Sequence, residues 1–299
     1  LRASAAAGLA AALEPAARLS PPWHTWMDNV AFDLRAASRS PAAEHLIAFN
    51  GQALAQLRQA GRERMDSALL MSANSHLRRV VRMHGQALAR YPLERSWATR
   101  LLGRNLAEYA RAERIHVASA HALESFVEEG VPEEKLSLFP LTPDPRFTPN
   151  VRAPTGGSFD VVYVGSLSVV KGVPLLIDAV RRLAHRDLRL VLIGGWGTRG
   201  MRRFVQDACA SDARIRICRG DPLPHLRRAA VCVHPSWEDG FGYAPVEALS
   251  CGVPTIVSEN TGMKELIVPG RNGMVLPTGD LDALAEAIDS AYRGELLSG

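Results

Sequence analysis

Short apolar strand patterns alternate with amphipathic helix patterns from residue 158 to residue 292, and this alternation constrains the fold more than any other feature. The predicted strands are runs rich in β-branched residues at 159–165, 188–195, 215–218, 230–233 and 255–258. The predicted helices are at 174–184, 204–209, 223–229, 244–250 and 281–292, the last with Asp280 as its N-cap. Continuously apolar strands joined by helices are typical of a parallel sheet that is covered on both faces. The pattern predicts a Rossmann-like, doubly wound α/β domain.

The first half of the chain carries a similar but less regular pattern. Strands are predicted at 46–49, 68–71, 115–118 and 136–139. Helices are predicted at 52–64, at 77–111 with a break at Tyr91-Pro92, and at 121–129 with Ser119 as N-cap. Residues 140–157 hold five prolines and little apolar periodicity, which indicates a linker. We therefore predict a partial N-terminal domain at 1–142, a linker at 143–157 and a C-terminal domain at 158–299.

Composition excludes several classes of protein. With 299 residues, 47% of them hydrophobic and 22% charged, the chain suits two globular domains and not a disordered segment. No apolar run approaches the roughly 20 residues that cross a bilayer, and no secretory-signal pattern opens the sequence. The four cysteines form no close pair of the kind that binds zinc, so reduced thiols are expected. The expected location is the cytoplasm.

Seven arginines crowd the predicted helical region between residues 78 and 104, in a chain of net charge +4. Such a cluster favours an anionic partner, and a peripheral contact with the anionic inner face of a membrane is one candidate. Nucleic acid is not expected, because neither a recognition motif nor interleaved aromatic residues accompany the cluster.

The segment after the predicted strand 230–233 carries the strongest functional signal. Two glycines in Gly240-Phe241-Gly242 allow a tight turn, and the free N–H groups at the start of the next helix form an anion-binding site. Asp239, with Glu238 before it, and Glu247 in the helix offer carboxylates, which suit sugar hydroxyls better than phosphate. This pattern favours a diphosphate flanked by two polyols. A plain strand-to-helix turn with acidic residues near the helix start is the structural alternative.

Here the sequence resembles the retaining glycosyltransferases of family 4, whose GT-B fold has two facing Rossmann-like domains. The resemblance covers about residues 105–292, and Asp239 and Glu247 occupy the two ends of the family's acidic donor motif around Gly-Phe-Gly. The usual first residue is Glu, so Glu238 stays an alternative to Asp239, which we prefer on register. The resemblance implies that Asp239 contacts the donor sugar, that the Gly-Phe-Gly backbone contacts sugar or phosphate, and that Glu247 binds the ribose hydroxyls.

A second match follows the strand 159–165, at Gly165-Ser166 and at Lys171. Family members often carry Arg after the glycine and Lys near the helix start, both bound to the donor diphosphate. Lys171 is present, whereas Ser166 stands at the Arg position. Phosphate neutralisation is therefore expected to rest on Lys171 and helix N–H groups, with Gly165 and Ser166 beside them as donor-binding residues. On its own, a Lys before Gly is more simply explained as a solvated residue at a helix start.

The first half, which should bind the acceptor, offers fewer signals. His76 directly follows the predicted strand 68–71, where a cleft-lining catalytic residue belongs. A helix-capping or packing role explains it equally well. Asn50-Gly51 follows the strand 46–49 in the same way, and a plain turn accounts for it. His234 is placed to line the cleft by position alone.

The resemblance implies metal-independent transfer of a hexose from a nucleotide sugar to a hydroxyl of a glycan, lipid-linked or small-molecule acceptor, with retention of configuration and without a cofactor. Asp239 or Glu238, His76 and Lys171 are the candidate catalytic residues. Hydrolysis by two opposed carboxylates is a second possibility, but no second acid is evident. A non-catalytic sugar-nucleotide binder or an inactive fragment is a third, since the chain begins at Leu1 and its first domain lacks a clear opening strand with a glycine-rich turn.

Overall fold

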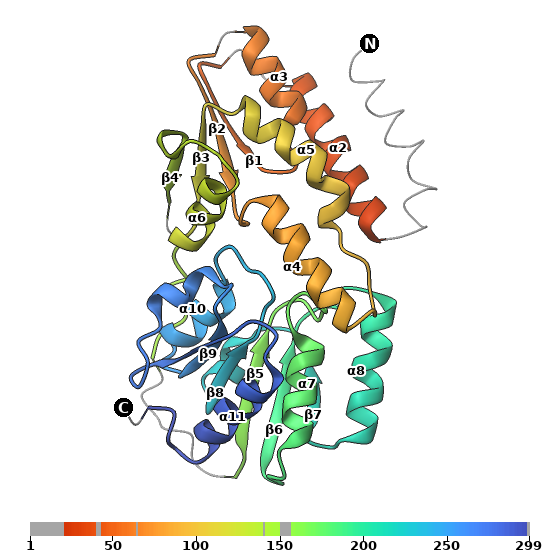
Figure 1. Ribbon diagram of the computed structural model, residues 1–299, viewed down its shortest axis with the longest axis vertical. Helices are drawn as coiled ribbons and strands as arrows, with labels where there is room; N and C mark the ends of the chain where they lie inside the picture. Colours follow the sequence, from red (N-terminus) through yellow and green to blue (C-terminus); the bar gives the residue numbers. More distant parts are fainter. Residues whose placement is uncertain (1–20, 40–42, 64, 140, 150–156, 298–299) are drawn as a thin grey trace. The chain divides into compact units, whose positions relative to one another are not determined.

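The computed structural model describes residues 21–39, 43–63, 65–139, 141–149 and 157–297 of the chain. These residues form two compact α/β units (Figure 1). The first unit contains the described residues of Leu1–Gly85 and Arg95–Pro140, and the second contains Gln86–Glu94 and the described residues of Leu141–Gly299. The segment Gln86–Glu94 therefore packs with the second unit, although it lies within the range predicted for the N-terminal domain.

The second unit is built on a six-stranded parallel sheet. Its strands are β5 (Phe159–Val164), β6 (Leu188–Ile193), β7 (Ile215–Cys218), β8 (Val231–His234), β9 (Thr255–Ser258) and β10 (Gly273–Leu276). They lie in the order β10-β9-β8-β5-β6-β7, all in parallel register. The chain reverses its direction of travel across the sheet between β5 and β8, and ligands of doubly wound folds bind at such a switch point, outside the carboxyl ends of the strands.

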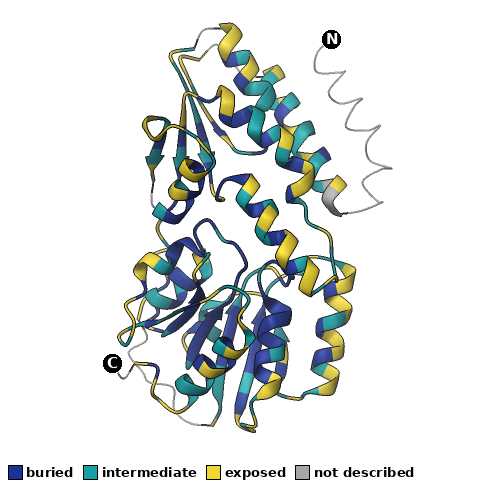
Figure 2. Ribbon diagram, viewed as in Figure 1, coloured by how far each residue is buried: buried dark blue, intermediate teal, exposed yellow. Residues whose placement is uncertain are grey.

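Helices cover both faces of this sheet, as the alternating strand residues require. The helices are α7 (Val173–Arg182), α8 (Arg199–Ser211), α9 (Leu223–Leu226), α10 (Tyr243–Ser250) and α11 (Leu281–Tyr292), with a 3-10 turn η2 (Gly262–Leu266). Val161 and Tyr163 of β5 pack into the core with α7, α8 and α11, whereas Val162 packs into the core with α9 and α10. The four central strands β5, β6, β8 and β9 are largely buried on both faces (Figure 2). The predicted Rossmann-like domain is confirmed.

Three elements of the second unit differ from the sequence-based expectation by more than two residues. α8 begins at Arg199 and not at residue 204, because Thr198 Oγ1 caps it by accepting the N–H of Met201 at 3.2 Å. β10 was not predicted, because it opens with Gly273, where an added Cβ would lie 1.9 Å from the carbonyl oxygen of Thr255. Gly273 interrupts the apolar pattern that would indicate a strand, and because it has no side chain it allows β9 to approach closely. α9 ends at Leu226 and not at residue 229, because the chain turns there to enter β8. The predicted N-cap of α11 is confirmed, since Asp280 Oδ1 accepts the N–H of Ala283 at 2.9 Å.

The first unit has a four-stranded parallel sheet whose strands lie in chain order. They are β1 (His45–Phe49), β2 (Ser67–Ser72), β3 (Arg114–Val117) and β4 (Leu136–Leu138). The helices are α2 (Pro21–Arg39), α3 (Leu54–Glu63), α4 (Leu77–Arg90), α5 (Ala98–Arg111) and α6 (Ala120–Glu128), with a 3-10 turn η1 (Glu133–Lys135). The core joins one face of this sheet to α3, α5 and α6. On β1, Ile47 and Phe49 are 65% and 66% exposed.

In the first unit, the sequence predicted one helix break and one N-cap correctly, and one helix was missed. The break at Tyr91-Pro92 separates α4 from α5, and Ser119 Oγ caps α6 by accepting the N–H of Ala122 at 3.0 Å. α2, which two prolines open, was not predicted. The alanine-rich start of the chain lies outside the described residues.

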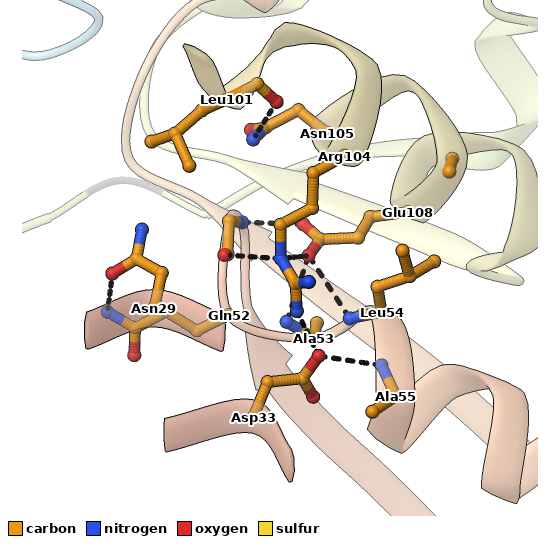
Figure 3. Close-up of polar contacts among 12 residues, drawn as sticks. Asn29, Asp33, Gln52, Ala53, Leu54, Ala55, Leu101, Arg104, Asn105 and Glu108 are labelled. Atoms are coloured by element: carbon orange, nitrogen blue, oxygen red, sulfur yellow. Dashed lines mark hydrogen bonds and ion pairs between the residues drawn. The ribbon is translucent and has the colours of Figure 1, made fainter. Parts of the chain in front are cut away.

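A buried ion cluster closes the start of α3 (Figure 3). Glu108 and Asp33 are fully buried, and their carboxylates accept hydrogen bonds from the N–H groups of Gly51, Ala53, Leu54, Ala55 and Gln56. The guanidinium of Arg104 contacts both carboxylates and donates to the carbonyl oxygen of Gly51 at 2.9 Å. The protein's own carboxylates thus occupy the anion site that a helix N-terminus offers, and Arg104 balances their charge.

Four of the seven arginines between residues 78 and 104 form ion pairs within the first unit. Arg78 and Arg82 pair with Glu129 at 3.6 and 2.8 Å, and Arg79 pairs with Glu128 at 3.1 Å. Arg104 belongs to the buried ion cluster. These four arginines thus have carboxylate partners within the protein, and an anionic partner for this cluster stays a prediction. Among the described helices, none is both long and apolar enough to cross a membrane.

Candidate functional site

Two loops leave neighbouring strands at the switch point of the second unit and are locked together. One runs from residue 165 to 172 after β5, and the other from 235 to 242 after β8. The N–H of Trp237 donates to the carbonyl oxygen of Val170 at 2.9 Å. Gly172 has φ 75°, and an added Cβ would lie 2.0 Å from the carbonyl oxygen of Pro235. Only glycine fits this point of contact between the loops.

The carboxylate of Asp239 is the centre of the contacts between these loops. Its Oδ2 lies 2.7 Å from Nζ of Lys171 and 2.9 Å from Nε2 of His234. Burial by itself would raise the pKa of Asp239, but the Lys171 ammonium and the His234 hydrogen bond hold that pKa well below its usual range. Asp239 is therefore ionised at any physiological pH. Asp239, which we prefer to Glu238 on register, and Lys171, the predicted phosphate-binding residue, thus form one ion pair.

His234 is fixed behind Asp239 by an aromatic neighbour. Its side chain is buried, and its ring stacks on Tyr163 with centroids 6.1 Å apart and an interplanar angle of 6°. Tyr163 is fully buried and donates its hydroxyl to the carbonyl oxygen of Ser166 at 2.8 Å. Burial chiefly, with the nearby Asp239 charge, raises the pKa of Tyr163. Sequence reasoning placed His234 at the cleft by position only and did not find Tyr163, which looks like an ordinary strand residue.

Glu238 and Asp239 differ clearly in their surroundings. The Glu238 residue is 4% exposed, and its carbonyl oxygen accepts the hydroxyl of Ser236 at 2.9 Å. Asp239 is only half-buried, and its backbone is held on both sides: its N–H donates to Asn260 and its carbonyl oxygen accepts from Gly262, both at 2.9 Å. A ligand at the strand ends meets the side chain of Asp239 more readily than that of Glu238.

The glycine turn positions the start of α10. Gly242 has φ 90° and would bring an added Cβ within 2.9 Å of Thr261 Cγ2 and 3.1 Å of Met263 Cγ. The side chain of Phe241 is buried and packs edge to face on Tyr243, with ring centroids 5.1 Å apart. Phe241 therefore offers a ligand its backbone only. The first turn of α10 carries N–H groups that have no partner within the helix, and together with the helix dipole they favour an anion.

Glu247 lies in the second turn of α10 and is half-buried. Burial raises the pKa of Glu247; the nearby Arg146 lowers it, while Asp144 and Asp221 add to the rise. Within the described part of the chain, its carboxylate has neither a hydrogen bond nor an ion pair. A half-buried carboxylate of this kind is a good acceptor for ligand hydroxyls, because each oxygen can take more than one hydrogen bond.

The two residues predicted beside Lys171 contribute mainly backbone. Gly165 donates its N–H to the carbonyl oxygen of Ile193 at 2.9 Å. A Cβ added to Gly194 would lie 1.8 Å from the carbonyl oxygen of Gly165, so the backbones of these two glycines are in close contact. Ser166 is exposed at the end of β5. A serine hydroxyl cannot replace the charge of Arg, so Lys171 is the cation of this loop.

His76 lies in the first unit and has the contacts of a capping and packing residue. The residue is 2% exposed, and its ring packs against Tyr109 and Phe126, with centroid distances of 4.9 and 5.1 Å. Its Nδ1 accepts the N–H of Arg78 at 3.3 Å, at the start of α4. Burial lowers the pKa of His76 to about 4, against smaller effects of Glu129, Arg78 and Arg82. The ring is therefore neutral at physiological pH, and a catalytic role for it stays a prediction.

Taken together, the second unit offers a cation, a helix N-terminus and two carboxylates at one sheet edge. Lys171 and the start of α10 suit an anion, and Asp239 and Glu247 suit hydroxyl groups. Among the described residues, no group of three or more His, Cys, Asp or Glu side chains is arranged to hold a metal ion.

A protein family matches most of the second unit. Residues 158–293 match the model of the family described as glycosyl transferases group 1. A D-inositol 3-phosphate glycosyltransferase of Pseudarthrobacter chlorophenolicus is 27% identical over 199 residues, which are 60% of this chain and 47% of that protein. A capsular polysaccharide biosynthesis glycosyltransferase, CapM, of Staphylococcus aureus is 26% identical over 148 residues, or 47% of this chain and 38% of that protein. The chain thus spans about half the length, or less, of these curated relatives.

Solved structures share the fold across both units. Sucrose-phosphate synthase from Thermosynechococcus elongatus superposes with a TM-score of 0.65 at 21% identity, covering 85% of this chain and 66% of that one. Anabaena HepE in complex with UDP-glucose superposes with a TM-score of 0.66 at 18% identity, covering 84% of this chain and 70% of that one. These likenesses confirm the GT-B type of α/β fold. The second unit therefore matches the glycosyl transferases group 1 over residues 158–293, and the fold of the chain is of the GT-B type.

Proposed function

We propose that this chain transfers a hexose from a nucleotide-sugar donor to an acceptor hydroxyl, with retention at the anomeric carbon and without a metal ion. The acceptor class we propose is a glycan, a lipid-linked sugar or a small molecule. The observation that supports the proposal most directly is the contact of Asp239 with both Lys171 and His234, at the switch point and beside the start of α10. The segment that carries these residues is the one that matches the glycosyl transferases group 1.

Each group at this edge has a role in donor binding. Lys171 and the N–H groups at the start of α10 hold the diphosphate, because a cation and a helix N-terminus both favour an anion. Glu247 accepts hydrogen bonds from the ribose hydroxyls, and Asp239 accepts them from the donor sugar. Without a ligand, Lys171 is neutralised by Asp239 at 2.7 Å. A bound diphosphate would share Lys171 with Asp239 and free the carboxylate to bind the sugar.

In the proposed reaction, negative charge develops beside Lys171 and the start of α10. The bond between the anomeric carbon and the diphosphate oxygen breaks, and the acceptor oxygen bonds to the same face of that carbon. The acceptor proton passes to the departing phosphate oxygen, so the products are the glycoside and the nucleoside diphosphate. Lys171 and the helix N-terminus stabilise the negative charge that grows on the leaving phosphate, which is electrostatic catalysis by a preorganised anion site.

The nucleotide base and the sugar are best sought by screening. HepE was solved with UDP-glucose and the curated relatives are sugar transferases, so UDP-sugars come first in a panel that also contains ADP- and GDP-sugars. Release of the nucleoside diphosphate is measured with and without candidate acceptors. The same measurement is made on Lys171→Met and on Lys264→Met.

Lys264 is a matched control, because it lies in the same unit and its Nζ donates to the carbonyl oxygen of Glu259 at 2.8 Å and not to a carboxylate of the proposed site. Loss of a charge-assisted contact worth about 1.5–3 kcal/mol lowers the apparent donor affinity about 10- to 150-fold in Lys171→Met. Lys264→Met keeps the wild-type value. Equal behaviour of the two variants contradicts the site. Donor binding without turnover by the wild type points instead to a sugar-nucleotide binder.

A further inference from the structure

Glu94 lies far from the proposed donor site in the sequence but next to it in the second unit. It follows Tyr91-Pro92-Leu93 between α4 and α5, in the segment Gln86–Glu94 that packs with the second unit. Its side chain is directed at the loop 165–172, which carries Lys171. Neither the donor motif nor the proposed mechanism uses this residue.

The carboxylate of Glu94 binds the backbone of the Lys171 loop directly. Its Oε1 accepts the N–H of Val169 at 2.8 Å, and the N–H of Val170 also donates to the carboxylate. Its Oε2 lies 3.5 Å from the hydroxyl of Thr198, the N-cap of α8. Burial raises the pKa of Glu94, and the two backbone hydrogen bonds oppose that rise. Two successive N–H groups make an anion-binding hollow, and here a carboxylate of the protein fills it.

The segment that carries Glu94 is firmly anchored. Tyr91 donates its hydroxyl to Asp178 Oδ2 at 2.7 Å, and the side chains of Tyr91 and Leu93 pack on the core of the second unit. An added Cβ on Gly200 would lie 2.2 Å from the carbonyl oxygen of Leu93, so the backbones approach as closely as glycine permits. Glu94 is thus held in a fixed position from which it can hold the loop in turn.

The residues after β8 hold the other side of the loop 165–172. The carbonyl oxygen of Val170 accepts the N–H of Trp237 at 2.9 Å, and Gly172 abuts Pro235. The peptide groups just before Lys171 are therefore held by Glu94 through their N–H groups and by the loop 235–242 through a carbonyl oxygen. These two sets of contacts fix the backbone before Lys171, from which the Lys171 side chain extends to Asp239.

We propose that Glu94 is a positioning residue that fixes the Lys171 loop in the conformation required to bind the donor diphosphate. This inference rests on the proposed function for its ligand, but the anchoring of the loop is a property of the protein without ligand. Residues of a binding site act at full strength only when their supports hold them in place, so the effect of Glu94 is expected to pass through Lys171.

The test is a double-mutant cycle with UDP as the probe, read by isothermal titration. Glu94→Gln keeps the size of the side chain but removes its charge, so the charge-assisted hydrogen bonds from the loop N–H groups become weaker neutral ones. We expect it to weaken UDP binding about 10-fold or more in the wild-type background, and less than about 2-fold in Lys171→Met. Tyr292→Phe is the matched control, because it removes a tyrosine-to-aspartate hydrogen bond of the same unit, to Asp187 Oδ1 at 2.7 Å, outside the Glu94 segment and the Lys171 loop, and it should leave UDP affinity within about 2-fold.

Hydrogen exchange gives a second reading that needs no ligand. In Glu94→Gln the amides of Val169 and Val170 should exchange about 10-fold faster, while those of the buried strand β6 keep their wild-type rates. Unchanged exchange and unchanged UDP affinity overturn the inference, as does a loss of affinity that is equally large in the Lys171→Met background. If the wild type fails to bind UDP, ADP and GDP alike, the proposed function is contradicted, and the exchange of these two amides alone decides the role of Glu94.

Discussion

Replacement of Gly172 by alanine tests the packing that brings Lys171 to Asp239. Gly172 has φ 75°, a left-handed conformation that costs an L-residue about 1–2 kcal/mol. The new Cβ would also lie 2.0 Å from the carbonyl oxygen of Pro235, a backbone atom that cannot rotate away. The two loops must separate to make room, and overpacking of this kind costs about 1–3 kcal/mol more.

Gly294→Ala separates the two costs. Gly294 has φ 77°, nearly the same as Gly172, but its Cβ would meet no atom within 4 Å. This variant should lose about 1–2 kcal/mol of the unfolding free energy of the second unit, from backbone conformation alone. Gly172→Ala should lose about 2–5 kcal/mol, and the difference between the two variants measures the clash. Urea unfolding followed by tryptophan fluorescence gives both values.

The same pair of variants separates stability from binding. Separation of the loops in Gly172→Ala moves Lys171 away from the diphosphate, so UDP affinity should fall by about 10-fold or more, whereas Gly294→Ala should bind as the wild type does. Isothermal titration is done at a temperature where both variants remain folded. If Gly172→Ala and Gly294→Ala prove equal in unfolding free energy and in UDP affinity, the close contact of the loops at Gly172 is refuted.

Three further variants probe other parts of the structure. Arg104→Met leaves two buried carboxylates without their cation, so it should lower the unfolding free energy of the first unit by about 3–5 kcal/mol, measured in urea. The control Arg111→Met, on the exposed side of α5, should lower it by under about 1 kcal/mol. Equal losses in the two variants would contradict the buried ion cluster. Burial lowers the pKa of His76 from 6.5 to about 4, so the unfolded chain takes up the proton first. Stability should therefore be lost as pH falls from about 6.5 to 4, by up to about 3 kcal/mol, and a His76→Asn variant that keeps the same pH slope would refute this. Glu247→Gln should weaken UDP binding by about 1–3 kcal/mol while leaving inorganic phosphate binding unchanged; full UDP affinity would remove Glu247 from the ribose site.

The second unit was predictable from sequence because its signals are local. Each strand pattern and the loop that follows it lie within a few residues, so the carboxyl-end position of Lys171 and Asp239 follows from the strand boundaries alone. The choice of Asp239 over Glu238 also rests on spacing, and the ion pair with Lys171 supports it. The strand β10 was missed where a glycine, required for a close backbone approach, interrupts the apolar pattern.

Contacts between distant segments could not be predicted in this way. Glu94 binds Val169, 75 residues further along the chain, and nothing in the turn after Tyr91-Pro92 signals that partner. The ion pairs of Arg79 and Arg82 were not predicted either, because their partners Glu128 and Glu129 lie at the end of another helix. Such pairs depend on how the helices pack, which hydrophobic periodicity does not specify.

The central claim is that a nucleotide sugar binds at the switch point of the second unit. A crystal structure of the protein with UDP tests it most directly. The account predicts the diphosphate between Nζ of Lys171 and the first turn of α10, with the ribose hydroxyls donating to Glu247. A structure in which UDP lies elsewhere, with Lys171 still paired to Asp239 and no contact to α10, would contradict it.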